Sequence, residues 1–155
     1  MPSRRDMFSH SAKLAALLAV LGLLPTSARA QTASYNAVAF DAKSISEAMR
    51  ALGANTPTES VDVNLVGPNI AENGAVVPIS VSTVLPGVKR MLILVEKNPA
   101  VLSAVFDVND TIESSFSTRV KMGQSSLVYA VALMSDGRVL FAQKDVKVTL
   151  GGCGG

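Results

Sequence analysis

The sequence predicts an all-β protein: an immunoglobulin-like antiparallel β-sandwich of about seven strands, with a short N-terminal helix and a flexible C-terminal Gly-Gly-Cys-Gly-Gly arm. Three observations support this prediction. From residue 60 onward, apolar and polar residues alternate with a period of two. Pairs containing Gly, Pro or Asn interrupt the alternation at regular intervals. A helical pattern occurs only once after the N-terminal region.

Residues 1–30 are typical of a twin-arginine-type signal peptide. Arg4 and Arg5 precede an apolar run of eleven residues, 14–24, and the small-x-small pattern of residues 28–30 predicts cleavage after Ala30. A helix that crosses a bilayer needs about 20 apolar residues, so we expect no permanent membrane anchor. The arginine pair predicts export to the periplasm by the twin-arginine pathway. An ordinary signal peptide with two basic residues is the alternative, since Met7 stands where that motif usually has phenylalanine.

Removal of this segment changes the charge and the chemistry of the chain. The remaining 125 residues are enough for one domain, which we place at residues 31–150. The signal holds four of the fourteen basic residues and one of the twelve acidic residues, which leaves ten and eleven, a net charge of −1. We therefore expect no nucleic-acid partner. His10, the only histidine, also lies in the signal, so we expect neither a metal site nor a cofactor.

The one helical pattern lies at residues 44–53. Ser44 can cap the first turn, Glu47 completes a capping box, and Gly53 is a suitable stop. The apolar residues fall on one face: Ile45, Ala48, Met49 and Leu52. The pattern predicts a short amphipathic helix that packs on the domain.

The predicted strands follow in order along the chain. Turn signals separate them, of which Asp136-Gly137 is a strong hairpin signal. Residues 147–150 either extend the last strand or begin the arm. The predicted strands are residues 61–65, 77–81, 88–95, 102–108, 116–122, 127–134 and 139–146.

Two strand features have both a functional and a structural interpretation. The segment 88–95 is apolar on both faces, which indicates either a subunit interface or a strand covered on both faces within one domain. The pairs Lys89-Arg90 and Arg119-Lys121 would make a small anion-attracting face, although a solvated strand face is the favoured interpretation.

The candidate functional residue is Cys153, the only cysteine, which lies between Gly151-Gly152 and Gly154-Gly155. Glycine has no side chain, so residues 151–155 predict a thin, flexible arm that can enter a narrow cleft. From Leu150 the thiol can reach about 10 Å. The mature chain offers no histidine and no second cysteine, which argues against a thiol enzyme or an internal disulfide. A disordered tail with an incidental cysteine is the alternative to a functional arm.

The arm, the exported β-domain and several short motifs together resemble SoxY, the sulfur-carrier family of the bacterial thiosulfate-oxidising system. The matching stretches are residues 77–80, 97–99, 118–126 and 145–155. The resemblance implies that Cys153 binds the substrate covalently, as an S-thiosulfonate and then a persulfide, and that the chain is a carrier rather than an enzyme. Gly151, Gly152, Gly154 and Gly155 would form the swinging arm.

The resemblance also implies the partners. A second small β-protein, SoxZ, would form a heterodimer with the chain. Transient contacts are implied with a haem-containing thiosulfate-coupling protein, a manganese sulfate-releasing hydrolase and, where present, a sulfur dehydrogenase. The alternative function is a secreted immunoglobulin-like interaction module that forms an intermolecular disulfide through Cys153.

Overall fold

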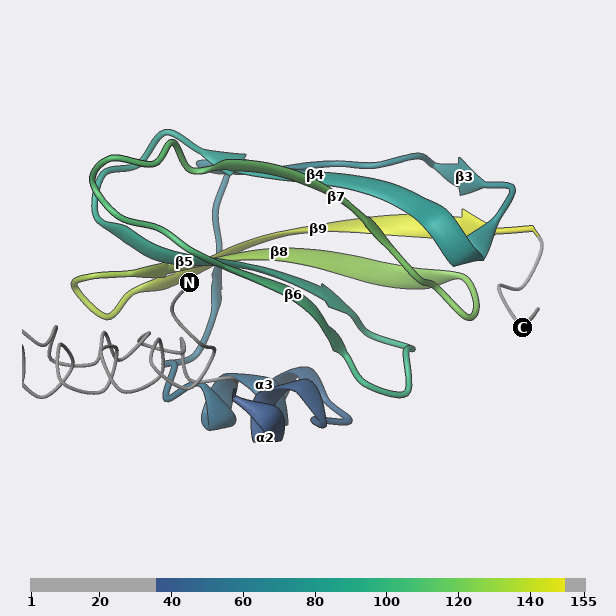
Figure 1. Cartoon of the computed structure of the whole chain (residues 1–155), viewed down its shortest axis with the longest axis horizontal. Helices are drawn as coiled ribbons and strands as arrows, with labels where there is room; N and C mark the ends of the chain where they lie inside the picture. Colours follow the sequence, from purple (N-terminus) through teal and green to yellow (C-terminus); the bar gives the residue numbers. More distant parts are fainter. Residues whose placement is uncertain (1–35, 150–155) are drawn as a thin grey trace, which may run out of the picture. The chain divides into compact units, whose positions relative to one another are not determined.

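The computed structural model describes residues 36–149, which form two packed β-sheets with a layer of two short helices (Figure 1). Seven strands in this part have four or more residues, and two have only two, so the prediction of a sandwich with about seven strands is confirmed. The helices are α2 (Ala37–Phe40) and α3 (Ile45–Ala51), with the 3-10 helix η1 (Gly74–Val76). The strands are β1 (Thr58–Glu59), β2 (Val63–Val66), β3 (Ile70–Ala71), β4 (Val77–Thr83), β5 (Val88–Val95), β6 (Leu102–Asp107), β7 (Ser115–Val120), β8 (Ser126–Met134) and β9 (Val139–Val148).

The predicted helix is α3, and Ser44 caps it as expected: its side chain accepts a hydrogen bond from the Glu47 backbone N–H. The Glu47 carboxylate accepts a hydrogen bond from the N–H of Lys43, one residue before the cap, where a regular capping box would use the N–H of Ser44. Gly53 has a φ of 65°, the left-handed conformation that glycine adopts without strain. The short helix α2 was not predicted, because four residues are too few to produce a helical pattern.

The larger sheet has the order β1-β9-β8-β5-β6, and the smaller sheet has the order β2-β4-β7. The long neighbours within each sheet are antiparallel, as predicted. In Figure 1 the smaller sheet covers one face of the larger sheet, and the helices cover the other. The fold therefore has two hydrophobic cores, one on each face of the larger sheet.

Strand β5 lies between these two cores, which explains why it is apolar on both faces. Met91, Ile93 and Val95 belong to the core between the sheets. Leu92 and Leu94 belong to the core beneath the helices. All five residues are fully buried, so the interpretation of this strand as covered within one domain is confirmed and a subunit interface is not needed to explain it.

The segment 58–71 differs from the prediction, because it changes sheets twice. It pairs with β9 through β1, crosses to β4 as β2, and returns to β9 as β3. The two pairings with β9 are parallel and only two residues long. They supply backbone partners to parts of the outer edge of β9. Val61 lies in the turn between β1 and β2 and is 99% exposed, so its assignment to a strand was wrong.

The Asp136-Gly137 hairpin is confirmed, and Gly137 adopts a φ of 89°. Strand β9 then runs through Val148, so the strand alternative for residues 147–148 is correct. Within residues 36–149 no helix is long and apolar enough to cross a membrane.

Candidate functional site

The residues predicted to bind substrate lie beyond the described part of the chain. Cys153 and its glycines follow Thr149, the last described residue, and the signal residues Arg4, Arg5 and Ala30 precede Asn36. The structure instead describes the root of the arm, which is the end of β9 and the segments that contact it (Figure 1). The root determines from which point on the domain the thiol can extend.

The end of β9 is held on its outer edge by β3. The parallel register places Ile70 beside Lys147 and Ala71 beside Val148. The Lys147 N–H donates to the Asn69 carbonyl over 3.0 Å, and the Thr149 N–H donates to the Ala71 carbonyl over 3.1 Å. These two bonds fix β9 up to Thr149, which directly precedes Leu150, the anchor of the arm.

The opposite edge of β9 is held by a side chain. The Val148 N–H donates to the Ser125 Oγ over 2.9 Å, directly beyond the last β8–β9 pair, Ser126 with Val146. The Thr149 hydroxyl also donates to the Glu72 carbonyl over 3.5 Å. The backbone at the end of β9 is therefore hydrogen-bonded on both edges of the strand, which restricts the conformations that the root can adopt.

Removal of the Ser125 hydroxyl should loosen the root. Ser125→Ala leaves the half-buried Val148 N–H without its acceptor, which costs about 0.5–1.5 kcal/mol. We expect faster hydrogen exchange at Val148 and Thr149 with little change elsewhere, measured by amide exchange NMR. Ser117→Ala is the control, because Ser117 is exposed and its hydroxyl bonds only the Ser80 hydroxyl. Equal protection of Val148 in both variants would contradict a role for Ser125 in holding the root.

Asn98, for which the sequence predicted no role, connects two loops at the end of the domain where β9 ends. Asn98, in the β5–β6 turn, donates to the Lys121 carbonyl over 2.7 Å and accepts from the Gly123 N–H over 3.3 Å. These bonds tie the β5–β6 turn to the connection that carries Ser125. Asn98 belongs to a stretch that resembles the sulfur-carrier family, but nothing in the sequence indicates its two long-range partners.

The charged side chains near the root do little to stabilise a thiolate. Lys147, the cation nearest to Cys153 in sequence, forms an ion pair with Asp145, with Nζ and Oδ2 2.6 Å apart. Both side chains are more than half exposed, so the pair is worth little energy, yet it offsets the charge of Lys147. Among the described residues there is no cluster of three metal-ligating side chains.

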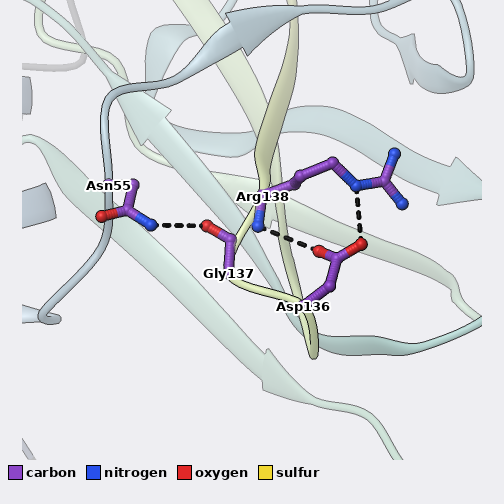
Figure 2. Close-up of polar contacts among 4 residues, drawn as sticks. All are labelled: Asn55, Asp136, Gly137 and Arg138. Carbon is purple, nitrogen blue, oxygen red and sulfur yellow. Dashed lines mark hydrogen bonds and ion pairs between the residues drawn. The ribbon is translucent and has the colours of Figure 1, made fainter.

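The far end of the sandwich carries a second polar cluster, at the β8–β9 hairpin (Figure 2). The Asn55 side chain donates to the Gly137 carbonyl over 2.8 Å, which joins the segment after α3 to the turn. Asp136 accepts from the backbone N–H of Arg138 over 3.0 Å and from its Nε over 2.7 Å. This cluster stabilises the hairpin, since each bond closes the turn or anchors it.

A cavity of about 430 Å³ adjoins this hairpin, and Lys89 and Arg90 are among its lining residues. Arg90 is paired with Asp107, with Nε and Oδ1 2.6 Å apart. Arg119 lies on β7 in the other sheet, so the two basic pairs are divided between the two sheets. This division and the Asp107 pairing favour the interpretation as solvated strand faces.

The hairpin cluster predicts a pH effect. The pKa of the Asp136 carboxyl is lowered, mainly because the backbone N–H of Arg138 and then its side chain bond the ionised form. The resulting stabilisation is present above the ordinary pKa of the carboxyl and is lost as the pH falls through the lowered one. We expect Arg138→Gln to raise the Asp136 pKa part of the way, measured by NMR titration. Arg90→Gln, the control, should leave it unchanged.

Comparison with known proteins identifies a family and a related solved structure. The family model of the sulfur oxidation protein SoxY matches residues 48–153, and thus its match ends at Cys153. The solved structure of the sulfur carrier protein SoxY from Chlorobium limicola f thiosulfatophilum is 31% identical in sequence. The similarity has a TM-score of 0.59 and covers 66% of this chain and 92% of that chain.

More distant similarity concerns the fold alone. A superoxide reductase (neelaredoxin) from Ignicoccus hospitalis is 14% identical, with a TM-score of 0.50 over 56% of this chain and 79% of that chain. No curated protein sequence matches the chain.

Proposed function

This chain belongs to the family of the sulfur oxidation protein SoxY, and from that premise we propose that it is a periplasmic carrier for thiosulfate oxidation that binds its substrate covalently through Cys153. The observation that carries the proposal is the extent of the family match, which runs to Cys153 itself. The match therefore includes the first glycines of the arm together with the thiol. The domain is the carrier and its partners supply the chemistry.

The geometry of the root supports an arm that moves independently of the domain. The described backbone is hydrogen-bonded as far as Thr149, and the next residues are Leu150 and the glycines. Glycine restricts the backbone less than any other residue, so residues 151–155 would form the swinging segment. A glycine arm on a fixed root would allow one thiol to visit several enzymes while the substrate stays attached.

The proposed covalent cycle takes place on the Cys153 sulfur. A bond forms between the Cys153 sulfur and the outer sulfur of thiosulfate, the thiol proton is lost, and two electrons pass to the haem-containing coupling protein. The product is a cysteine S-thiosulfonate. Water, directed by the manganese hydrolase, then cleaves the bond between the outer sulfur and the sulfonate group. Sulfate and protons are released, and a persulfide remains on Cys153. A sulfur dehydrogenase, where present, would oxidise that remaining sulfur.

The thiol itself would be activated only in a partner. A free cysteine has a pKa of about 8.5, so most of it is protonated at neutral pH. Lys147 forms an ion pair with Asp145, and the mature chain has no histidine to serve as a base. The carrier alone would therefore react slowly, which limits unwanted oxidation of an exposed thiol.

The proposal includes a partner and a route of export. We place the chain in a heterodimer with SoxZ, exported to the periplasm by the twin-arginine pathway through Arg4 and Arg5, with cleavage after Ala30. That pathway carries folded proteins, so the pair would form before export. A partner with its own functional signal peptide would contradict this order of events.

The intact mass of the mature protein tests the proposed function. It would be purified without reductant from cells exposed to thiosulfate, with Cys153→Ser as the control. We expect thiosulfonate and persulfide adducts on the wild type alone, and a mass that places cleavage after Ala30. An unmodified thiol, or only a stable disulfide to one protein, would support the interaction module instead.

A larger side chain in the arm should slow transfer of the substrate. Gly152→Val preserves the thiol but adds a branched side chain that stiffens and thickens the arm, so we expect transfer to slow about tenfold or more. The measurement is the rate of thiosulfate-dependent cytochrome reduction at several carrier concentrations. Gly123→Val is the control, because a Cβ added at Gly123 would meet no atom within 4 Å. Normal turnover of Gly152→Val would show that no narrow cleft receives the arm.

A further inference from the structure

The pair Asn73-Gly74, between β3 and η1, has the composition of a site of spontaneous chemical modification. The chain has seven asparagines, and Asn73 is the one that a glycine follows. An asparagine side chain loses ammonia when the backbone nitrogen of the next residue attacks its carbonyl carbon and closes an imide ring. A side chain on that next residue hinders the attack, and glycine has none. By sequence, Asn73 is therefore the most reactive amide of the chain.

The fold holds Asn73 away from the geometry that this reaction needs. Ring closure requires the Gly74 nitrogen to be eclipsed with the Asn73 Cβ, whereas at the observed ψ of 107° that nitrogen points away from Cβ. The Asn73 Oδ1 accepts a hydrogen bond from the Ala75 N–H over 2.9 Å, and the Asn73 backbone carbonyl accepts one from the Val76 N–H over 3.5 Å. The attack turns both carbonyl groups of Asn73, so it must break both bonds.

Asn73 also connects two segments that are anchored to different sheets. On one side, β3 pairs with β9 of the larger sheet, and the Ala71 carbonyl accepts the Thr149 N–H at the root of the arm. On the other side, the Gly74 carbonyl accepts the Met122 N–H over 2.7 Å, just beyond β7 of the smaller sheet. A longer backbone between Ala71 and Gly74 would therefore strain one of the two anchors.

Of these two anchors, β3 is the weaker. It has only two residues, and one of them, Ile70, is 61% exposed, so the strand buries little apolar surface. Met122 is fully buried and Gly74 is buried as well, so the hydrogen bond between them is shielded from water. Strain in this connection should therefore be relieved at β3, which holds the root of the arm.

We propose that Asn73 is a site of spontaneous deamidation that the fold suppresses, and that its modification releases the root of the arm. The Gly74 nitrogen loses its proton and bonds to the Asn73 Cγ, and ammonia leaves. Water then opens the imide at the backbone carbonyl and gives isoaspartate, so one water is consumed and no oxidant is needed. Isoaspartate adds a methylene group to the backbone before Gly74, together with a negative charge. The inference concerns the domain alone and goes beyond the proposed carrier function.

Peptide mapping by mass spectrometry tests the suppression by the fold. The mature protein is incubated at mildly alkaline pH, and the same chain in guanidinium chloride is the unfolded reference. Asn69, which is exposed and followed by isoleucine, is the internal control. We expect Asn73 to deamidate first in the unfolded chain, and about tenfold or more slowly in the folded protein, because the reaction must wait for local opening. Equal rates at Asn73 in the two conditions would overturn the suppression.

Amide exchange NMR tests the effect on the root. The isoaspartate form is made in guanidinium chloride and refolded, with unmodified protein treated in the same way as the control. Folded protein that is aged until part of it is modified gives the comparison without a refolding step. Asn73→Asp is the matched variant, because it adds the charge without the methylene group, and its carboxylate can still accept the Ala75 N–H.

We expect exchange at Lys147 and Thr149 to become about tenfold or more faster in the isoaspartate form, because these two N–H groups bond to the segment that contains β3. Val131, fully buried on β8, should keep its protection in every form, and Asn73→Asp should resemble the wild type. Wild-type protection of Thr149 in the isoaspartate form, or an equal loss in Asn73→Asp, would overturn the release of the root.

Discussion

Cys153→Ser should abolish thiosulfate oxidation while leaving the domain fully folded. The hydroxyl is a far weaker nucleophile than the thiolate and forms no persulfide, so no substrate can be attached. The bonds described for the root are made by Thr149 and earlier residues, so the variant keeps all of them. We expect a total loss of turnover with an unchanged midpoint of thermal unfolding.

The measurement is thiosulfate-dependent reduction of cytochrome in a mixture of the purified partners, with the thermal midpoint followed by circular dichroism. Wild-type protein alkylated at Cys153 is a second inactive form that contains no substitution. Binding of the proposed partner, SoxZ, should be the same for all three proteins. Residual turnover by Cys153→Ser would mean that the substrate is bound elsewhere, since the chain has no other cysteine.

Ile93→Ala should cause the largest loss of stability. Ile93 is fully buried at the centre of β5, and its cross-strand neighbours are Ala104 on β6 and Ala130 on β8. Two alanines offer little bulk to fill the space, so the cavity should persist. A loss of about 3–5 kcal/mol is expected for such a substitution. That is a large part of the 5–15 kcal/mol that is usual for a folded domain, as an order of magnitude.

Urea unfolding measures this effect as a change in the midpoint at constant slope. Ile112→Ala is the matched control, because it removes the same atoms from a side chain that is 45% exposed. We expect the control to lose less than about 1 kcal/mol. Similar losses for the two variants would show that the centre of β5 is not tightly packed.

The strand pattern allowed most of the fold to be predicted. The seven longer strands were identified within a few residues, because each has a buried face or two buried faces that produce a period-two or a continuous apolar pattern. The capping of α3 was predicted correctly because Ser44 and Glu47 act within a single turn. The segment 58–71 was predicted less well. Two-residue strands have no detectable period, and their partners on β9 are more than seventy residues away.

The candidate site was predicted only in part. The sequence indicated the thiol and its glycines, since a sole cysteine among glycines is apparent without any structure. Ser125 and Asn98 were not identified as part of the root, because a serine or an asparagine in a loop is common and its partner is unknown.

The sequence by itself determined the local properties of this protein: the strands with their two-sided or one-sided burial, the hairpin at Gly137, the helix cap, and the composition of the arm with Cys153. These depend on residues close together in the chain. Only the tertiary structure decided which face of β5 meets the helices, and that β3 and Ser125 hold β9 as far as Thr149. It also decided that Ile70 is exposed beside the root. Such relations arise from hydrogen bonds and packing between distant segments, which no local pattern records.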